Sequence, residues 1–164
     1  MNATDNPPPN IGIVNRASSY GVTETVDRLL ALFQSTGMKI FARIDQQLEA
    51  QAVGLSMLPT CVLIFGDPRV GTALMNQFPS LALDWLLKVL VWQYISGSVW
   101  DSYYSGGYLQ QRHSLPETPL KALDGLIGQA LARFFAEAAP VRRSQYPVDS
   151  KVGLEKSFII GCGV

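Results

Sequence analysis

The sequence predicts an α+β fold with two layers, in which helices pack on one face of an antiparallel β-sheet. Strand-like and helix-like segments follow one another in the order β-α-β-β-α-β-β-α, and short hairpin-type connections join several of the strands. The 164 residues are 48% apolar, which is enough for one domain with a buried core. We expect a disordered arm over residues 1–10, the domain over 11–139 and a C-terminal extension over 140–164.

A strand over residues 11–17 and an amphipathic helix open the predicted domain. Within the helix, apolar side chains recur at the spacing of one helical face, at Val26, Leu29, Leu30 and Phe33. Thr23 is the expected N-cap, because its hydroxyl can accept a hydrogen bond from the first turn. Gly37 is the expected C-cap, since glycine readily adopts the backbone conformation that ends a helix.

Two further strands and a short helix are predicted next. Residues 38–47 read as a strand with two unlike faces, whose apolar set is Ile40, Ala42 and Ile44. Residues 48–58 are expected to connect this strand to a third one over 60–65. A short helix follows over 72–77, and Pro79 interrupts it because proline cannot continue a helix.

A β-hairpin and a long helix complete the pattern. The segments LLKVLVWQY and SVWDSYY, joined at Ser96-Gly97, are typical of two strands with a short turn. The segment YLQQRHSL is compatible with a helical turn and with a loop. The clearest helix follows Pro119, with an apolar stripe of Leu123, Leu126, Ile127, Ala130, Leu131 and Phe134. The tail ends in the strand-like residues Ser157–Ile160.

The segment VLIFGDPRVGTALMNQ has the order of strand, glycine-containing loop and helix that phosphate-binding loops share. A P-loop also needs a lysine that reaches the outer phosphates, and here Thr72 follows Gly71 with no lysine between them. Pro68 lacks a backbone N–H donor, and Asp67 would repel phosphate. We interpret the segment as a turn begun by Asp67-Pro68, with Thr72 as the cap of the next helix. A weaker anion site at that helix N-terminus is the alternative.

Charge and cysteine content exclude several classes of function. The 13 basic and 13 acidic side chains balance, which argues against nucleic-acid binding. The N-terminal residues show no signal peptide, and the apolar run Leu81–Ile95 is too short to span a bilayer. Cys61 and Cys162 form no close pair and fit a reducing cytoplasm, so we predict a cytoplasmic protein without a membrane partner. Cys61 is interpreted as a small apolar filler of a strand.

His113 is the only histidine, which excludes a multi-histidine metal site within one chain and most catalytic triads. A surface or capping role is the simplest interpretation. The alternative is an axial ligand to haem iron or a metal, and a symmetric dimer would then supply two such ligands. Aromatic side chains near it in the sequence belong either to the sheet core or to an apolar pocket or dimer surface: Trp85, Trp92, Trp100, Tyr103, Tyr104 and Tyr108.

Five segments also form a pattern of their own: FARID, PTCVLIFGDPRVGTALM, LALDWLLKVLVWQ, GSVWDSYY and YLQQRHSL. Together they resemble the bacterial and archaeal domain-of-unknown-function 302 family. Its pattern runs approximately FARIDH, RPTELLIFGNPKAGTPLM, DLPLKALVWED and GKVWLSYNDPAYLAARHGL. The similarity covers residues 11–115, and the positions that match include Arg43, Asp45, Trp92, Trp100, Tyr108, Arg112 and His113.

The resemblance implies a β-α-β(4)-α fold related to the topology of the TATA-binding protein, a dimer, and no established reaction. The sequence departs from the family pattern at several polar positions. Gln46 stands where the family has histidine, Leu58 where it has arginine, and Cys61 where it has glutamate. These departures remove charge from the expected pocket, so an apolar ligand or a protein surface becomes the favoured partner.

We therefore expect a homodimeric, non-enzymatic protein that binds an apolar or aromatic ligand, with haem as the most concrete candidate and His113 as its axial ligand. The expected walls are Trp92, Trp100, Tyr103 and Tyr108, and the polar groups are Arg43, Asp45, Arg112 and His113. One alternative is an enzyme on a small anionic substrate, with Asp45 as base, Arg43 or Arg69 as anion ligand and His113 as acid. The other is a structural or partner-binding module whose tail adds a strand to another chain.

Overall fold

The computed structural model describes residue 7 and residues 10–115. Several expectations lie outside this part of the chain: the arm before residue 10, the helix after Pro119, the strand-like tail Ser157–Ile160 and the domain boundary at residue 139. They stay predictions.

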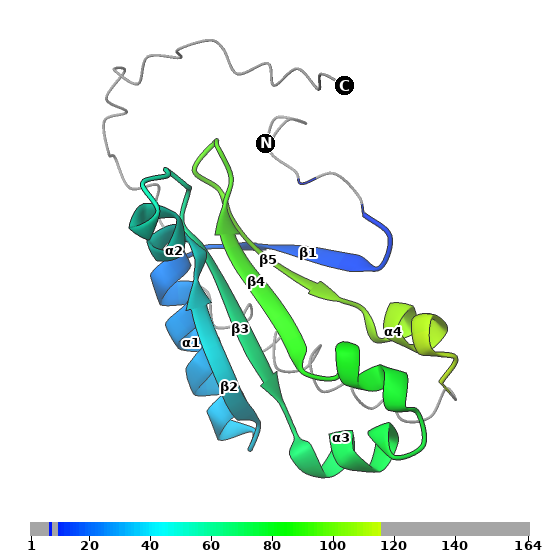
Figure 1. The fold of residues 1–164 in the computed structure, drawn as a ribbon. Helices are drawn as coiled ribbons and strands as arrows, with labels where there is room; N and C mark the ends of the chain where they lie inside the picture. The colour runs from blue at the N-terminus through cyan, green and yellow to red at the C-terminus, as the bar shows by residue number, and fades with distance from the viewer. Residues whose placement is uncertain (1–6, 8–9, 116–164) are drawn as a thin grey trace, which may run out of the picture.

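Five antiparallel strands form one sheet in the order β1-β5-β4-β3-β2 (Figure 1). The elements in chain order are β1 (Ile13–Ser18), α1 (Val22–Ser35), β2 (Lys39–Asp45), α2 (Gln46–Ala52), β3 (Thr60–Gly66), α3 (Pro68–Met75), the 3₁₀ helix η1 (Pro79–Leu83), β4 (Leu87–Gln93), β5 (Val99–Tyr104) and α4 (Gly106–His113). The α+β class is confirmed, and so is the predicted hairpin, whose strands are β4 and β5.

Helix α1 supplies the core on one face of the sheet. Of its predicted apolar stripe, Val26, Leu29 and Phe33 are buried and Leu30 is partly buried. The ring of Phe33 stacks on that of Phe65 in β3 with centroids 3.9 Å apart. The predicted N-cap Thr23 is wrong, because the helix begins at Val22 and places Thr23 within its first turn; Gly21 is the N-cap. The C-cap is Thr36, one residue before the predicted Gly37, which follows with a φ of 78° in the left-handed region that favours glycine.

Helix α3 begins at Pro68, earlier than the predicted start at Thr72. Proline fits the first helical position because its missing N–H would have no partner there. The Asp67 side chain caps the helix by accepting a hydrogen bond of 2.9 Å from the Arg69 N–H, and it also pairs with the Arg69 guanidinium at 2.8 Å. The turn interpretation of this segment is therefore wrong. A carboxylate already occupies the helix N-terminus, so the alternative of an anion site there gains no support.

Two more helices occupy segments whose state the sequence left open. Residues 48–58 were predicted to be a connection, but α2 covers the first half of them, and Asp45 caps this helix by accepting from the Leu48 N–H at 3.1 Å. The segment YLQQRHSL lies largely in α4, which is capped by Ser105 and ends at the left-handed residue Ser114. In both cases a side-chain cap at a strand end starts the helix.

The sheet has one covered and one open face. On the covered face, alternate residues of β3 and β4 are buried in the core with α1: Cys61, Leu63, Phe65, Leu87, Val89 and Val91. The residues between them form the opposite face, which we call the open face. Helices α2, α3 and α4 lie toward the ends of the strands, so no described helix crosses the centre of the open face (Figure 1).

We predict that Gly71→Ala destabilises the protein by roughly 1–2 kcal/mol, because a Cβ at this position would overlap the buried indole of Trp85. Alanine alone would favour the helix by about 1 kcal/mol, so the clash must exceed that gain. Gly107→Ala in α4 is the matched control, since its Cβ would meet nothing within 4 Å. Denaturant unfolding measures both variants, and equal stabilities of the two would contradict the clash.

Candidate functional site

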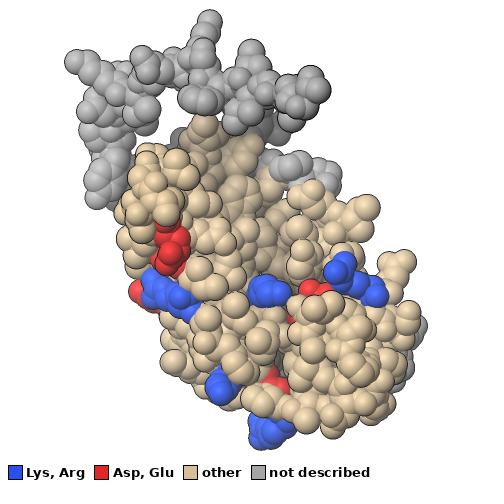
Figure 2. All heavy atoms as spheres, viewed as in Figure 1, with Lys and Arg blue, Asp and Glu red and all other residues tan. Residues whose placement is uncertain are grey.

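A groove of about 480 Å³ lies on the open face of the sheet. Its lining is mostly apolar and aromatic, and it comes from four strands and from the segment around α2: Ile13, Gln46, Met57, Thr60, Val62, Lys88, Leu90, Trp92, Ser102, Tyr103 and Tyr104. Figure 2 views this face and shows uncharged atoms over most of it, with a small basic patch near its centre. The volume lies in the range of about 300–1,000 Å³ that is usual for small-molecule sites.

Polar side chains in the floor of the groove bind one another. The Trp92 indole N–H donates to the Ser102 hydroxyl at 2.9 Å, and that hydroxyl donates to the Asn15 side-chain oxygen at 2.6 Å. This chain of hydrogen bonds joins β4, β5 and β1. Because each donor has a partner, the floor is held in one arrangement before any ligand enters.

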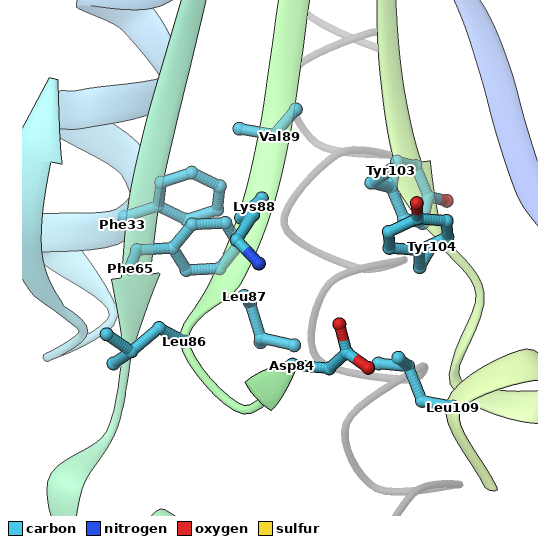
Figure 3. A pocket seen from close by; sticks show the side chains of 10 residues that line it. All are labelled: Phe33, Phe65, Asp84, Leu86, Leu87, Lys88, Val89, Tyr103, Tyr104 and Leu109. Carbon is cyan, nitrogen blue, oxygen red and sulfur yellow. The ribbon is translucent and has the colours of Figure 1, made fainter. Parts of the chain in front are cut away.

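A second cavity is far smaller. It lies beside the groove and has a volume of about 10 Å³, which is room for one water molecule at most (Figure 3). Phe33, Phe65 and Leu87 line it from the core, while Lys88 and Tyr104 belong to the groove as well. The groove is therefore the larger of the two cavities and the one with room for a small organic molecule.

A polar network surrounds Asp84, which precedes β4. The His113 ring donates from Nε2 to Asp84 Oδ2 at 2.9 Å, and Arg112 donates to the same oxygen at 2.8 Å. The Ser80 hydroxyl lies 3.2 Å from His113 Nδ1, and Arg112 also donates to the Tyr108 hydroxyl at 3.4 Å. Burial alone would raise the pKa of Asp84, but the hydrogen bonds from His113 and Arg112 hold it below its usual range.

Ser80, His113 and Asp84 together have the composition of a hydrolase triad. Their burial and contacts are instead those of a hydrogen-bond network that stabilises the fold. The His113 side chain is 4% exposed, and neither cavity includes Ser80 or His113. Arg112 shares the carboxylate oxygen that would have to stabilise an imidazolium. The network fastens the end of α4 to η1 and to the start of β4.

The same geometry bears on the haem hypothesis. Both ring nitrogens of His113 have hydrogen-bond partners within the chain, and the side chain does not line the groove. Iron coordination requires a free ring nitrogen, so this arrangement gives haem ligation no support. Among the described residues no group of three or more His, Cys, Asp or Glu side chains has the arrangement of a metal site.

Arg43 and Asp45 lie apart from His113. Arg43 pairs with Asp27 of α1 at 2.8 Å, and Asp45 caps α2. By strand register Asp45 is level with Cys61, and Cys61 is level with Val91 near the end of β4, whereas Asp84 precedes the start of that strand. The structure therefore does not bring Asp45 and His113 together as the base and acid of one active site.

The aromatic side chains predicted as pocket walls are divided between three places. Trp92 lines the groove, and Trp100 lies opposite it in the register of β4 and β5. Tyr103 touches the groove but packs against the core, with the Arg16 guanidinium 5.4 Å from its ring centroid. Tyr108 projects from α4 and stacks on Tyr104 with centroids 5.2 Å apart. Of the predicted walls, Trp92 and Tyr103 line the groove.

Sequence reasoning missed several residues of the groove and of the network. The alternation in LKVLVW carried a signal for the groove, because Lys88, Leu90 and Trp92 fall between the buried residues of the same strand. Asp84 was marked by the family pattern, in which an aspartate stands four residues before a lysine, as Asp84 stands before Lys88. Nothing in the sequence marked Ser80, because it is distant from His113 along the chain and the two meet only in the folded structure.

A buried carboxyl group lies on the covered face, level with Val91. Asp101 is 1% exposed, and neither of its side-chain oxygens has a hydrogen-bond partner in the part of the chain that the structure describes. Burial raises the pKa of Asp101 to about 7, and the nearby charge of Arg16 only partly opposes this. Cys61 is buried on the same face, and burial raises the pKa of its thiol, which fits its predicted role as an apolar filler.

Comparison with known proteins identifies similar folds and sequences. The profile of the family described as Domain of unknown function DUF302 matches residues 14–134. A crystal structure of an uncharacterised conserved DUF302 protein from Bacillus stearothermophilus is similar with a TM-score of 0.68 and 17% identity. The match covers 76% of this chain and 98% of that one. At this identity the similarity shows a shared fold.

Curated relatives are similar over part of their length. The chain is 39% identical over 104 residues to the fluoride-specific ion channel FluC 1 of Brucella suis and to that of Brucella abortus. The matched segment is 63% of this chain but 41% and 38% of those proteins, so the chain spans about two fifths of their length. Within the described residues, no helix combines the length and apolar character needed to cross a membrane.

Asp84→Asn should lower the free energy of unfolding by about 1–3 kcal/mol at pH 7, because the charged acceptor of His113 and Arg112 is lost. The folded pKa of Asp84 lies below the unfolded value of about 3.9. Its contribution is therefore complete above about pH 5 and is lost as the pH falls through the folded pKa. Denaturant unfolding at pH 7 and pH 3 should show the difference shrinking at low pH.

Asp27→Asn is the control for this prediction, because it removes an ion pair in which Asp27 is 57% exposed. A change below about 1 kcal/mol is expected there. If the two variants lost equal stability at pH 7, the hydrogen-bond network at Asp84 would stabilise the fold no more than an exposed ion pair does.

Asp101→Asn should remove a pH dependence of stability. The raised pKa means that the folded protein binds more protons than the unfolded chain between about pH 4 and 7, so wild-type stability falls as the pH rises through this window. The loss between pH 5 and pH 8 is expected to be about 2–3 kcal/mol in the wild type and near zero in the variant. Parallel pH profiles of the two proteins would show that Asp101 titrates normally.

Proposed function

We propose that this chain, which belongs to the DUF302 family, is a binding domain whose open-face groove holds one small, flat, apolar molecule. The observation that carries the proposal is the groove itself, about 480 Å³ on a sheet face that no described helix crosses. Antiparallel sheets commonly expose one face to water, but that face is then mostly polar. An apolar sheet face that no described element covers therefore indicates an interaction site.

The shape and lining of the groove favour a flat ligand. Leu90, Val62 and Trp92 project from neighbouring strands of one sheet, so their side chains form a broad, shallow floor. Tyr104 rises at one side, and its ring is supported by stacking on Tyr108. Aromatic and aliphatic side chains on a held floor favour face-on contact with a ring system.

The proposal includes no chemical step. The residues predicted for an acid–base reaction do not converge, and the hydrogen-bonded His113 lies outside the groove. The channel activity named for the Brucella relatives is not transferred, because about two fifths of their length is matched. A homodimer and a cytoplasmic location remain predictions from the sequence and its resemblance.

The neutral fluorescent dye N-phenyl-1-naphthylamine tests the groove in the full chain. We expect saturable binding at one site per chain, and Leu90→Gln should weaken it at least about fivefold by removing apolar contact from the floor. Leu48→Gln is the matched control, because Leu48 is 59% exposed on α2 and does not line the groove. Absence of saturable binding, or equal affinities in the two variants, would rule out the groove as a ligand site.

A further inference from the structure

We infer that the ligand is an organic anion with a flat apolar body, and that its anionic group pairs with Lys88. This inference rests on the proposed function, because it names the class of molecule that the same groove would bind. It comes from the one charged side chain among the described residues that line the groove.

Lys88 has no counter-charge among the described residues of the groove. Asp84 lines the small neighbouring cavity together with Lys88, but its carboxylate is already paired with His113 and Arg112. Among the described residues that line the groove, Lys88 is the charged one, and no acidic side chain accompanies it. Within this part of the chain the Lys88 ammonium group forms no hydrogen bond or ion pair. The side chains of Arg28, Arg43, Arg69 and Arg112, in contrast, all pair with carboxylates. The unpaired ammonium group therefore favours an anionic occupant.

The position of Lys88 sets the orientation of such a ligand. Lys88, Leu90 and Trp92 alternate along β4 and so project from the same face, spanning about 13 Å from the first to the third. The charge is thus at one end of an apolar strip. An anionic head at Lys88 would leave a body of two or three fused or linked rings lying over Leu90 toward Trp92.

Three of the other polar side chains in the lining already have hydrogen-bond partners, and Gln46, which also lines the groove, carries no charge. The indole N–H of Trp92 and the hydroxyl of Ser102 are already satisfied within the chain, and the Thr60 hydroxyl donates to the Leu58 carbonyl at 2.9 Å. Groups that have partners gain little from a ligand. The charged contact at Lys88 is therefore the contact expected to discriminate between ligands.

A second copy of the chain is a poorer occupant of the groove. If two open faces packed together, each Lys88 would enter a surface whose described lining holds no carboxylate. Burying an ammonium group without a partner costs free energy, so electrostatics would disfavour such a dimer. An organic anion supplies the missing charge and leaves the ammonium paired.

Two dyes with the same ring framework test the inference in the full chain. 8-Anilino-1-naphthalenesulfonate differs from N-phenyl-1-naphthylamine by one sulfonate group, so the ratio of their affinities isolates the anion. We expect the sulfonate dye to bind about tenfold more tightly than the neutral dye. Lys88→Met should remove this advantage and change the affinity for the neutral dye by less than about twofold. Raising the salt concentration should weaken binding of the sulfonate dye and leave the affinity for the neutral dye unchanged.

Lys39→Met is the control, because Lys39 is an exposed lysine outside the groove whose ammonium lies 4.8 Å from the Phe41 ring centroid. It should change neither affinity. Equal wild-type affinities for the two dyes, or equal weakening of both by Lys88→Met, would overturn the role of Lys88 and leave the groove as a site for neutral ligands. Failure of both dyes to bind would overturn the proposed function itself, and a doubled molar mass in light scattering that Leu90→Gln returns to that of one chain would then assign the face to self-association.

Discussion

The packing of α1 on one face of the sheet is the constraint on which the rest of this structure depends. Phe33 and Phe65 stack at its centre, and each fully buried aromatic ring stabilises the fold by about 1.5–3 kcal/mol. Because the strands alternate, committing one set of side chains to this core turns the other set toward the opposite face. The open face is thus a direct result of where the helix lies.

The two polar regions of the domain differ in whether their charges are satisfied. Around Asp84, one carboxylate accepts hydrogen bonds from both Arg112 and His113, so the Arg112 charge is paired and α4 is held in place. In the groove, Lys88 has no counter-charge among the described residues of a mostly apolar lining. A network whose charges are paired is most simply structural. An unpaired charge that lines a groove favours a role in binding a ligand of opposite charge. This difference places the candidate function on the sheet.

The sequence allowed the elements with a clear repeat to be predicted, and these are the elements that dominate the core. The stripe of α1 and the alternation of the hairpin strands were visible because each depends on local spacing. The start of α3 was missed because Asp67-Pro68 is compatible with a turn and with a helix N-terminus. The site was harder: the pairing of Asp84 with His113 and the separation of Asp45 from both depend on strand order, which spacing does not reveal.

The sheet order has a consequence for how the chain is made. Among the described strands, β1 pairs with β5 alone, and the hydrogen bond between Asn15 and Ser102 joins residues 87 positions apart. During synthesis the first strand therefore emerges long before its partner exists, while β2, β3 and β4 pair with neighbours close in the chain. Closing so long a loop is slow compared with local pairing. We therefore expect the N-terminal strand to join the sheet last. Until then its unpaired backbone N–H and C=O groups are open to pairing with other strands.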